Sequence, residues 1–364
     1  MGKRILMISA FPPCQKTAGE DYTRSLLFDL AEKGYEIDLI YAEYPGHEVD
    51  IPPQVKILEV LYPSLKNCIK KYYVHPFFSK RYDVKVRKMI QDIADQYDML
   101  YFDFTQVHYY SQFIVHPCKI LMCHDVIYQK YARKTGVINT SWIRYWEKKL
   151  LLTAKAGFTF SKKDSSIITD LYGIKTIPVN FYLKAKRFAY SESIEVSNKM
   201  CFYGAWNRAE NVEAIEVFVD KIFPLLKKKK DFEVIGGGMS KQLREKLENI
   251  GFRCLGFVEN PLFNLAECQA LIAPLKQGAG VKVKIIDSLT VGLPVIGTEV
   301  AFEGIEDNEK HKLFFHADAY TKFAEIIDNW RSVTKIDKQK AADEFYVRYS
   351  GNHFGDYIDQ LFIH

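Results

Sequence analysis

The sequence predicts an α/β protein built from two doubly wound domains in tandem. The chain has 364 residues, more than one ordinary hydrophobic core accommodates. Short apolar segments alternate with amphipathic segments of helical period, first up to residue 181 and again from residue 200. A polar stretch with neither pattern, residues 182–199, separates the two series. We therefore expect domains over 1–180 and 181–340, followed by a helix over 341–364.

The first series opens on a β-α-β unit. RILMISAF, followed by two prolines, predicts a buried parallel strand, and the loop ending in AGED leads to a helix that Gly34 ends. EIDLIYAE is the next strand. Further strands are expected at VKILEVL, MLYFDF, KILMCHD, GFTFS and IKTIPVNF, and helices at VRKMIQDIADQY, WIRYWEKKLLLTAKA and KDSSIITDLYG.

The second series repeats the alternation. Its strands are expected at MCFYGAW, DFEVIGGG, FRCLGFV, QALIAPL and HKLFFHAD, and its helices at NVEAIEVFVDKIFPLL, KQLREKLENIG and AYTKFAEIIDNW. Between them, QGAGVKVKIIDSLTVGLPVIGT supplies a glycine loop, a helix and a strand. Gly292 and Pro294 are expected to end that helix and turn the chain into the strand.

Composition excludes several classes of protein. A formal net charge of +5 is too small to indicate nucleic-acid binding. The seven cysteines form no CxxC pair, which indicates reduced, mostly buried thiols and no metal cluster. The N-terminal apolar run is too short to cross a bilayer and lacks a signal-peptide pattern, so we expect a cytoplasmic protein.

The loop QGAGVKVK predicts an anion site. A helix start offers unpaired backbone N–H groups and a partial positive charge, and two lysines add to both. Gly278 and Gly280 let backbone amides approach a ligand closely. Lys282 is the residue expected to hold a phosphate, and Lys284 supports it.

Several motifs resemble those of GT-B glycosyltransferases, in particular the GT4-like group. CFYGAWNRAENVEAI, FEVIGGG and RCLGFVENPLFNLAECQALIAPLKQGAGVKVKIIDSLTVGLPVIGT are similar to that family's donor domain, and AGEDYTRSLLFDLAEKGYEIDLIYAE, CHDV, FTFSKKDSSII and IPVNF resemble its first domain. The resemblance implies two Rossmann-like domains that face each other across a cleft, with the C-terminal helix packed back on the first domain.

The resemblance also implies roles for particular residues. Lys282 and Arg208 would hold the leaving diphosphate, and His124 and Asp125 would contact sugar or acceptor. The expected donor-binding residues are Gly204, Asn207, Phe257, Val258, Gly278, Gly280, Val281, Lys284, Asp287 and Glu303. Ala18 and Gly19 form the loop expected to lie beside phosphate or acceptor. Asn211 is expected instead to cap the following helix.

One position departs from the family pattern. Two acidic residues eight positions apart are frequent there, and here the first is Ala279 while the second is Asp287. A subgroup with G-x-G-x-K-x-K in this loop tolerates that loss, and the sequence resembles that subgroup. Asp287 would hydrogen-bond the ribose.

The expected function is transfer of a sugar from a nucleoside-diphosphate sugar to a glycan or lipid-linked acceptor, by a bacterial hexosyltransferase of cell-surface polysaccharide or glycoconjugate synthesis. The resemblance implies a retaining reaction with no metal and no cofactor. Two alternatives stay open: a sugar-nucleotide epimerase or hydrolase on the same fold, and a non-catalytic nucleotide-binding partner. Retained binding without turnover would identify the latter.

A basic, aromatic stretch over residues 66–88 suggests a further partner. Its lysines and its aromatic residues Tyr72, Tyr73, Phe77 and Phe78 suit the headgroup level of an anionic membrane. A solvated loop is the alternative.

Overall fold

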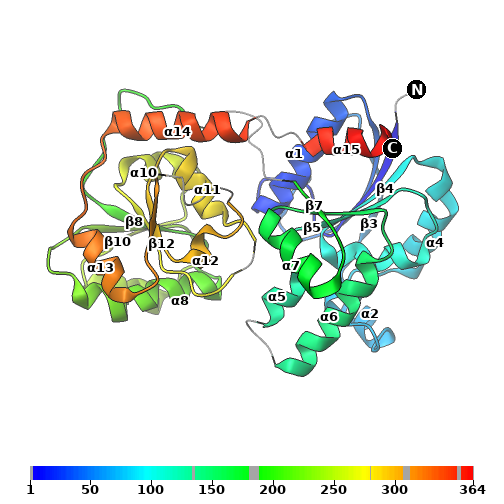
Figure 1. The fold of residues 1–364 in the computed structure, drawn as a ribbon, viewed down its shortest axis with the longest axis horizontal. Coiled ribbons are helices and arrows are strands. Elements are labelled where there is room, and N and C mark those ends of the chain that lie inside the picture. Colours follow the sequence, from blue (N-terminus) through cyan, green and yellow to red (C-terminus); the bar gives the residue numbers. More distant parts are fainter. Residues whose placement is uncertain are drawn as a thin grey trace. The chain divides into compact units, whose positions relative to one another are not determined.

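The computed structural model describes residues 3–132, 136–179, 188–278, 280–305, 312–350 and 354–363. The chain forms two compact units (Figure 1): unit 1 is Met1–Tyr182 with Asn352–His364, and unit 2 is Leu183–Gly351. Ala279 and residues 182–187 of the expected linker lie outside the described residues.

Unit 1 contains a parallel sheet of seven strands in the order β3-β2-β1-β4-β5-β6-β7. The strands are β1 (Arg4–Ser9), β2 (Glu36–Ala42), β3 (Lys56–Leu61), β4 (Met99–Asp103), β5 (Lys119–Cys123), β6 (Ala156–Thr159) and β7 (Ile177–Pro178). The strand order reverses between β1 and β4. Such a reversal leaves a crevice at the carboxyl ends of the strands, where open α/β sheets bind ligands.

Helices cover both faces of this sheet. They are α1 (Ala18–Glu32), α2 (Leu65–Lys70), α3 (Pro76–Ser79), α4 (Val84–Ile93), α5 (Ile127–Ala132), α6 (Val137–Leu151), α7 (Lys162–Tyr172) and α15 (Phe354–Ile363). Alternate residues of β1 enter two separate cores: Ile5 and Met7 pack with helix α1, whereas Leu6 and Ile8 pack on the opposite face. The sequence did not predict α2, α3, α5 or the 3-10 helix over Thr105–Phe113.

The C-terminal segment differs from the single helix expected over 341–364. It forms α14 (Lys335–Tyr349), which contacts unit 2, and the separate α15, which packs on α1 in unit 1 (Figure 1). Ile358 enters the α1 core, and Lys33 pairs with Asp356 at 2.6 Å and with Asp359 at 2.9 Å.

Unit 2 contains a parallel sheet of six strands in the order β10-β9-β8-β11-β12-β13. The strands are β8 (Met200–Tyr203), β9 (Phe232–Ile235), β10 (Arg253–Gly256), β11 (Leu271–Ala273), β12 (Val295–Gly297) and β13 (Phe314–His316). The helices besides α14 are α8 (Ala209–Val217), α9 (Lys241–Asn249), α10 (Pro261–Glu267), α11 (Val283–Thr290), α12 (Glu299–Phe302) and α13 (Tyr320–Asp328). The strand order reverses between β8 and β11, so this sheet has the same kind of crevice.

Two further expectations concern the whole chain. All seven cysteines lie in described ranges and are free thiols, as predicted. Among the described helices, none combines the length and the apolar character that a bilayer-crossing helix needs.

Candidate functional site: a lysine-rich helix start and a buried Asp–His pair

The predicted donor residues of unit 2 gather at the carboxyl ends of its parallel strands. Gly204 follows β8, Gly236 follows β9 and Phe257 follows β10. The loop of Gly278 and Gly280 follows β11, and Glu303 comes after β12 and the short α12. Because these strand ends lie along one edge of the sheet, residues that are up to about a hundred positions apart in the sequence lie at the same edge.

The loop before α11 folds back on itself through Lys282. The Lys282 ammonium donates to the Gly280 carbonyl at 2.7 Å and pairs with Glu303 at 3.2 Å. Both side chains are nearly buried, 9% and 6% exposed. Gly280 needs its φ of +66°, a conformation that favours glycine. Lys282 is thus at the helix start, as predicted, but here its charge is matched by Glu303.

Lys284 lies two residues, about half a turn, further along the helix and has a neutral hydrogen-bond partner. Its Nζ donates to Asn211 Oδ1 at 2.5 Å, and Asn211 Nδ2 donates to the Ala205 carbonyl at 2.8 Å. Burial lowers the pKa of Lys284 to about 8, the positive charges of Lys282 and Arg208 add to this effect, and Glu210 opposes it. A cation held in this way is stabilised by an incoming anion.

Asn211 is not the helix cap that the sequence suggested. Arg208 occupies the N-cap position of α8, and its side chain is exposed. Asn211 lies in the first turn, buried, and links Lys284 to the loop after β8. Sequence reasoning missed this role of Asn211, because it depends on burial. The Asn211 side chain lies directly beside Gly204, where a Cβ would be 2.7 Å from Asn211 Nδ2.

The ends of β8 and β9 are packed backbone to backbone. A Cβ on Gly236 would lie 2.0 Å from the Gly204 carbonyl oxygen, so no side chain fits there. Trp206 donates its backbone N–H to Gly237 at 2.8 Å, and Asn207 is exposed beside Gly238.

Asp287 and Phe257 bring a carboxylate and an aromatic ring to the same edge. Asp287 is buried in α11 and accepts a hydrogen bond from Tyr203 at 3.2 Å. Phe257 is 80% exposed and lies against Gly237, where a Cβ would be 3.2 Å from the Phe257 Cβ. Val258 is half-buried, and Val281 packs against Gly304. A ring this exposed is available to stack on a nucleobase.

Unit 1 carries a second cluster, centred on His124. This residue follows β5, and its Nε2 lies 2.8 Å from Oδ1 of Asp103, the buried last residue of β4. The Thr23 hydroxyl donates to the other Asp103 oxygen. In the neutral imidazole, an Nε2–H that donates to the carboxylate leaves Nδ1 as the nitrogen that can accept a hydrogen bond.

Gly19, in the first turn of α1, lies beside this imidazole. His124 stacks on Phe104 with ring centroids 3.6 Å apart, and a Cβ on Gly19 would lie 2.8 Å from Phe104 and 3.4 Å from His124 Nδ1. Phe104 has a φ of +66°, a strained value for a non-glycine residue. Packing against Phe104 and His124 therefore leaves no room for a side chain at Gly19. Ala18 and Gly19 were expected in a loop, but they are the first two residues of α1. Their contact with phosphate or acceptor stays a prediction.

Asp125 is held differently from His124. Its carboxylate pairs with Lys130 of α5 at 2.8 Å. The acid that orients His124 is Asp103, which sequence reasoning assigned only to a strand. A lone acid at the end of the apolar run MLYFDF was the available signal, since a buried carboxylate needs a partner.

Comparisons with known proteins agree with this geometry. Residues 197–331 match the family model described as Glycosyl transferases group 1. No curated protein matches the sequence. Among solved structures, sucrose-phosphate synthase from Thermosynechococcus elongatus superposes with a TM-score of 0.71 at 13% identity, covering 99% of both chains. A glycosyltransferase from Rickettsia africae gives 0.68 at 13%, covering 98% of this chain and 97% of that one.

A third similar structure contains a nucleotide. Anabaena HepE in complex with UDP and glucose has a TM-score of 0.64 at 10% identity, covering 99% of this chain and 98% of that one. At these identities the likeness concerns the fold. The findings confirm the predicted GT-B fold. The match of residues 197–331 to Glycosyl transferases group 1 agrees with the predicted class of enzyme, a glycosyltransferase.

Proposed function

We propose that the chain transfers a sugar from a nucleoside-diphosphate sugar to a glycan or lipid-linked acceptor. Unit 2 is the donor-binding side and unit 1 the acceptor side, in an enzyme of the GT4-like, G-x-G-x-K-x-K subgroup. The observation that carries this proposal is the start of α11, where Lys282, Lys284 and the backbone amides of the first helical turn lie beside the strand-order reversal.

The leaving diphosphate would be stabilised by charges already in place. In the transfer, the bond from the anomeric carbon to phosphate oxygen breaks and a bond to the acceptor oxygen forms on the same face, with retention. The acceptor proton passes to an oxygen of the leaving diphosphate. Lys282 turns from Glu303 toward this diphosphate, and Lys284 and the exposed Arg208 add positive charge, the role of a divalent metal in other transferases.

Other residues select the donor and the acceptor. Asp287 would accept from ribose hydroxyls, with Tyr203 holding it, and Phe257 would stack on the base. His124, oriented by Asp103, would bond a hydroxyl of sugar or acceptor through Nδ1. UDP is the first nucleotide to test, because HepE binds it in a solved structure.

A thermal-shift panel of UDP, GDP, ADP, TDP and CDP, with and without EDTA, tests the donor site. A nucleotide at about a hundred times its Kd stabilises a protein by roughly 2.7 kcal/mol. We expect one nucleotide to shift the wild type with or without EDTA, and to lose its effect in Lys282→Ala. Lys340→Ala, which changes an exposed lysine of α14, is the matched control. A panel without any shift contradicts the proposal.

Turnover separates a transferase from the two alternatives. Product released from the preferred nucleotide sugar only when an acceptor extract is added indicates transfer, whereas release without acceptor indicates a hydrolase or epimerase. The anomeric configuration of the product, read by NMR, tests retention. Binding without turnover under every condition would indicate the non-catalytic partner.

We also propose cytoplasmic, peripheral membrane contact through part of residues 66–88. In α2, Leu65 and Ile69 are exposed together with Lys66 and Lys70, and Tyr72 follows. Phe78, expected at the headgroup level, is instead buried in the unit 1 core, and Phe77 packs against that core. The exposed apolar face of α2 therefore carries this proposal.

Sedimentation with anionic vesicles tests the membrane contact. We expect binding that salt weakens and that the double variant Leu65→Asp/Ile69→Asp abolishes. Val347→Asp, which changes an equally exposed residue of α14, should leave binding intact. Equal sedimentation of all three proteins contradicts this contact.

A further inference from the structure

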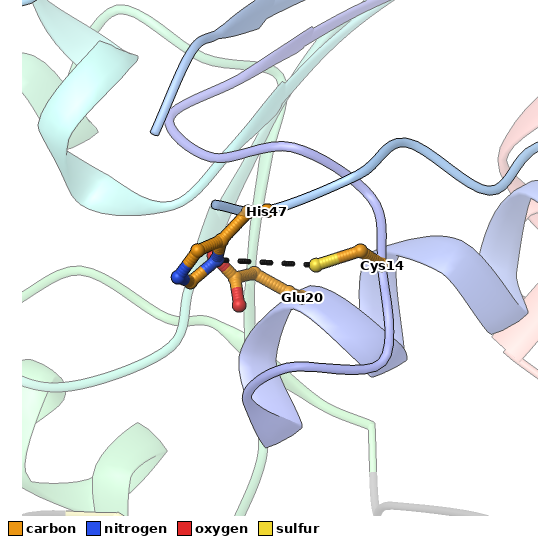
Figure 2. A group of neighbouring side chains, drawn as sticks. All are labelled: Cys14, Glu20 and His47. Carbon is orange, nitrogen blue, oxygen red and sulfur yellow. Dashed lines mark hydrogen bonds and ion pairs between the residues drawn. The ribbon is translucent and has the colours of Figure 1, made fainter. Parts of the chain in front are cut away.

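Two loops at the carboxyl edge of unit 1 bring together three side chains that the transfer reaction does not use. Cys14 lies in the loop after β1, Glu20 in the first turn of α1, and His47 in the loop after β2. Figure 2 shows these three side chains pointing toward one another. β1 and β2 are neighbouring parallel strands, so the two loops meet at the same edge of the sheet.

The three side chains lie at distances that suit a common ligand. His47 Nδ1 is 2.8 Å from a Glu20 oxygen and 3.9 Å from Cys14 Sγ. One ligand atom from each residue falls within 4.8 Å of the others. The donor set is one thiol, one imidazole and one carboxylate, which together are typical of a zinc-class divalent cation.

Burial makes this arrangement costly without a cation. Cys14 and Glu20 are each only 2% exposed, while the His47 side chain is 17% exposed. Within the described part of the chain, Glu20 Oε2 is buried and has no hydrogen-bond partner. A buried carboxylate oxygen without a partner loses its hydration and gains nothing in return. A metal ion would supply the missing partner.

The surrounding loops already hold the three residues in place. The Asp50 backbone N–H donates to the Pro13 carbonyl at 2.9 Å, directly before Cys14. Arg24 of α1 pairs with the Asp50 carboxylate, and Tyr44 packs edge-on against the His47 ring with centroids 4.8 Å apart. The ligands therefore come from segments that are tied to each other independently of any ion.

We propose that Cys14, Glu20 and His47 form a binding site for a divalent cation of the zinc class. Tetrahedral Zn²⁺ separates such ligand atoms by about 3.4–3.6 Å, so the two distances from His47, 2.8 and 3.9 Å, would change by roughly 0.3–0.6 Å. On binding, the Cys14 thiol releases its proton to solvent, and thiolate and carboxylate together neutralise the 2+ charge. A water molecule on the exposed His47 side would complete the four-coordinate shell.

The ion would stiffen the loop that carries Gly19. Glu20 directly follows Gly19, which lies against Phe104 and His124. An ion joining Glu20 to Cys14 and His47 would fix both ends of the turn from residue 14 to residue 20. All three ligands belong to unit 1, whereas the lysine-rich helix start belongs to unit 2.

Titration of the metal-free full-length chain with Co²⁺ and Zn²⁺ tests the site. Co²⁺ bound to a thiolate gives a charge-transfer absorption band, so the spectrum reports Cys14 directly. We expect one equivalent of Co²⁺ to produce this band and one equivalent of Zn²⁺ to remove it. Cys14→Ser should abolish the band, and His47→Gln should weaken binding at least about tenfold.

Matched variants keep the test decisive. Cys68→Ser changes another thiol of unit 1 and should leave the band unchanged. His47→Gln changes a loop residue that is partly exposed, so a folded protein is expected, and circular dichroism checks this. No band at one equivalent, or a band that survives Cys14→Ser, overturns the proposal. Neither outcome bears on nucleotide binding, which is measured separately on Lys282→Ala.

Discussion

Two lysines of unit 2, Lys284 and Lys338, both have a lowered pKa but differ in their hydrogen-bond partners and in their positions on the helices. Burial lowers the pKa of each to about 8. Lys338 of α14 is fully buried and donates to the carbonyls of Leu265, Ala266 and Cys268, at 3.2, 2.5 and 2.7 Å. Lys284 of α11 donates to the amide oxygen of Asn211.

The position of each lysine on its helices explains the difference. The carbonyls around Lys338 end α10, where the helix dipole is negative and a cation is stabilised. Lys284 lies at the start of α11, where the dipole is positive and Lys282 and Arg208 are close. Lys338 therefore contributes to the structure, whereas for Lys284 we propose a role in binding an anion.

The largest expected effect belongs to Lys338→Met. Three carbonyls at the end of α10 would lose their donor inside the protein, and we expect the free energy of unfolding to fall by about 2–4 kcal/mol. Urea unfolding measures this, with Lys340→Met on the exposed face of α14 as the control. An unchanged midpoint would show that Lys338 is not the structural member of the pair.

Lys284→Met should weaken nucleotide binding without lowering the free energy of unfolding. Removal of a cation from beside two others is expected to leave the unfolding free energy equal or higher, while nucleoside-diphosphate affinity falls about 10- to 100-fold, as for a lost charge-assisted contact. Calorimetric titration and urea unfolding of the same sample check both. A fall in unfolding free energy as large as that of Lys338→Met would contradict the proposed difference between a structural lysine and an anion-binding lysine.

The pH dependence gives a smaller, directional effect. Nucleotide affinity should fall above pH 8, by up to about tenfold per pH unit, because the Lys284 proton must be taken up on binding. The slope should vanish in Lys284→Met and persist in Lys338→Met. Stability moves oppositely. With a folded pKa near 8 and an ordinary value of 10.5, the buried positive charge of each lysine, relative to its neutral form, lowers the unfolding free energy in full below pH 8. This cost is relieved as the pH rises from 8 to 10.5.

The smallest effect is expected from Glu303→Gln. Glu303 competes with phosphate for Lys282, so its neutralisation should raise nucleotide affinity by about two- to fivefold. Titration with UDP and with UDP-sugar measures this. A fall in affinity for the sugar nucleotide alone would instead place Glu303 among the direct donor contacts, as the resemblance implied.

The sequence predicted what depends on local pattern. Strand–helix alternation predicted both sheets, and QGAGVKVK predicted a glycine loop followed by the start of α11, because these signals lie within one short segment. The anion site at that helix start stays a prediction. The sequence predicted helix in the C-terminal segment over 341–364, but not that it divides into α14 and α15, which belong to different units.

Contacts between distant segments could not be predicted in this way. Asp103 with His124, Asn211 with Lys284, and Cys14 with His47 each join the ends of different strands, and their meeting depends on strand order and register. Phe78 was wrongly predicted to be exposed for a related reason. The surrounding basic residues suggested a surface segment, and its burial depends on how that segment packs on the rest of unit 1.

Calorimetric titration of UDP at pH 7.5 into wild type, Lys282→Ala, Lys284→Met and Lys340→Ala tests the central claim most directly, with any other nucleotide that the thermal-shift panel favours run alongside. If the start of α11 is the diphosphate site, wild type and Lys340→Ala bind one equivalent equally well, and both other variants lose at least about tenfold in affinity. Equal affinity in all four proteins would contradict the assignment of the donor site to this helix start.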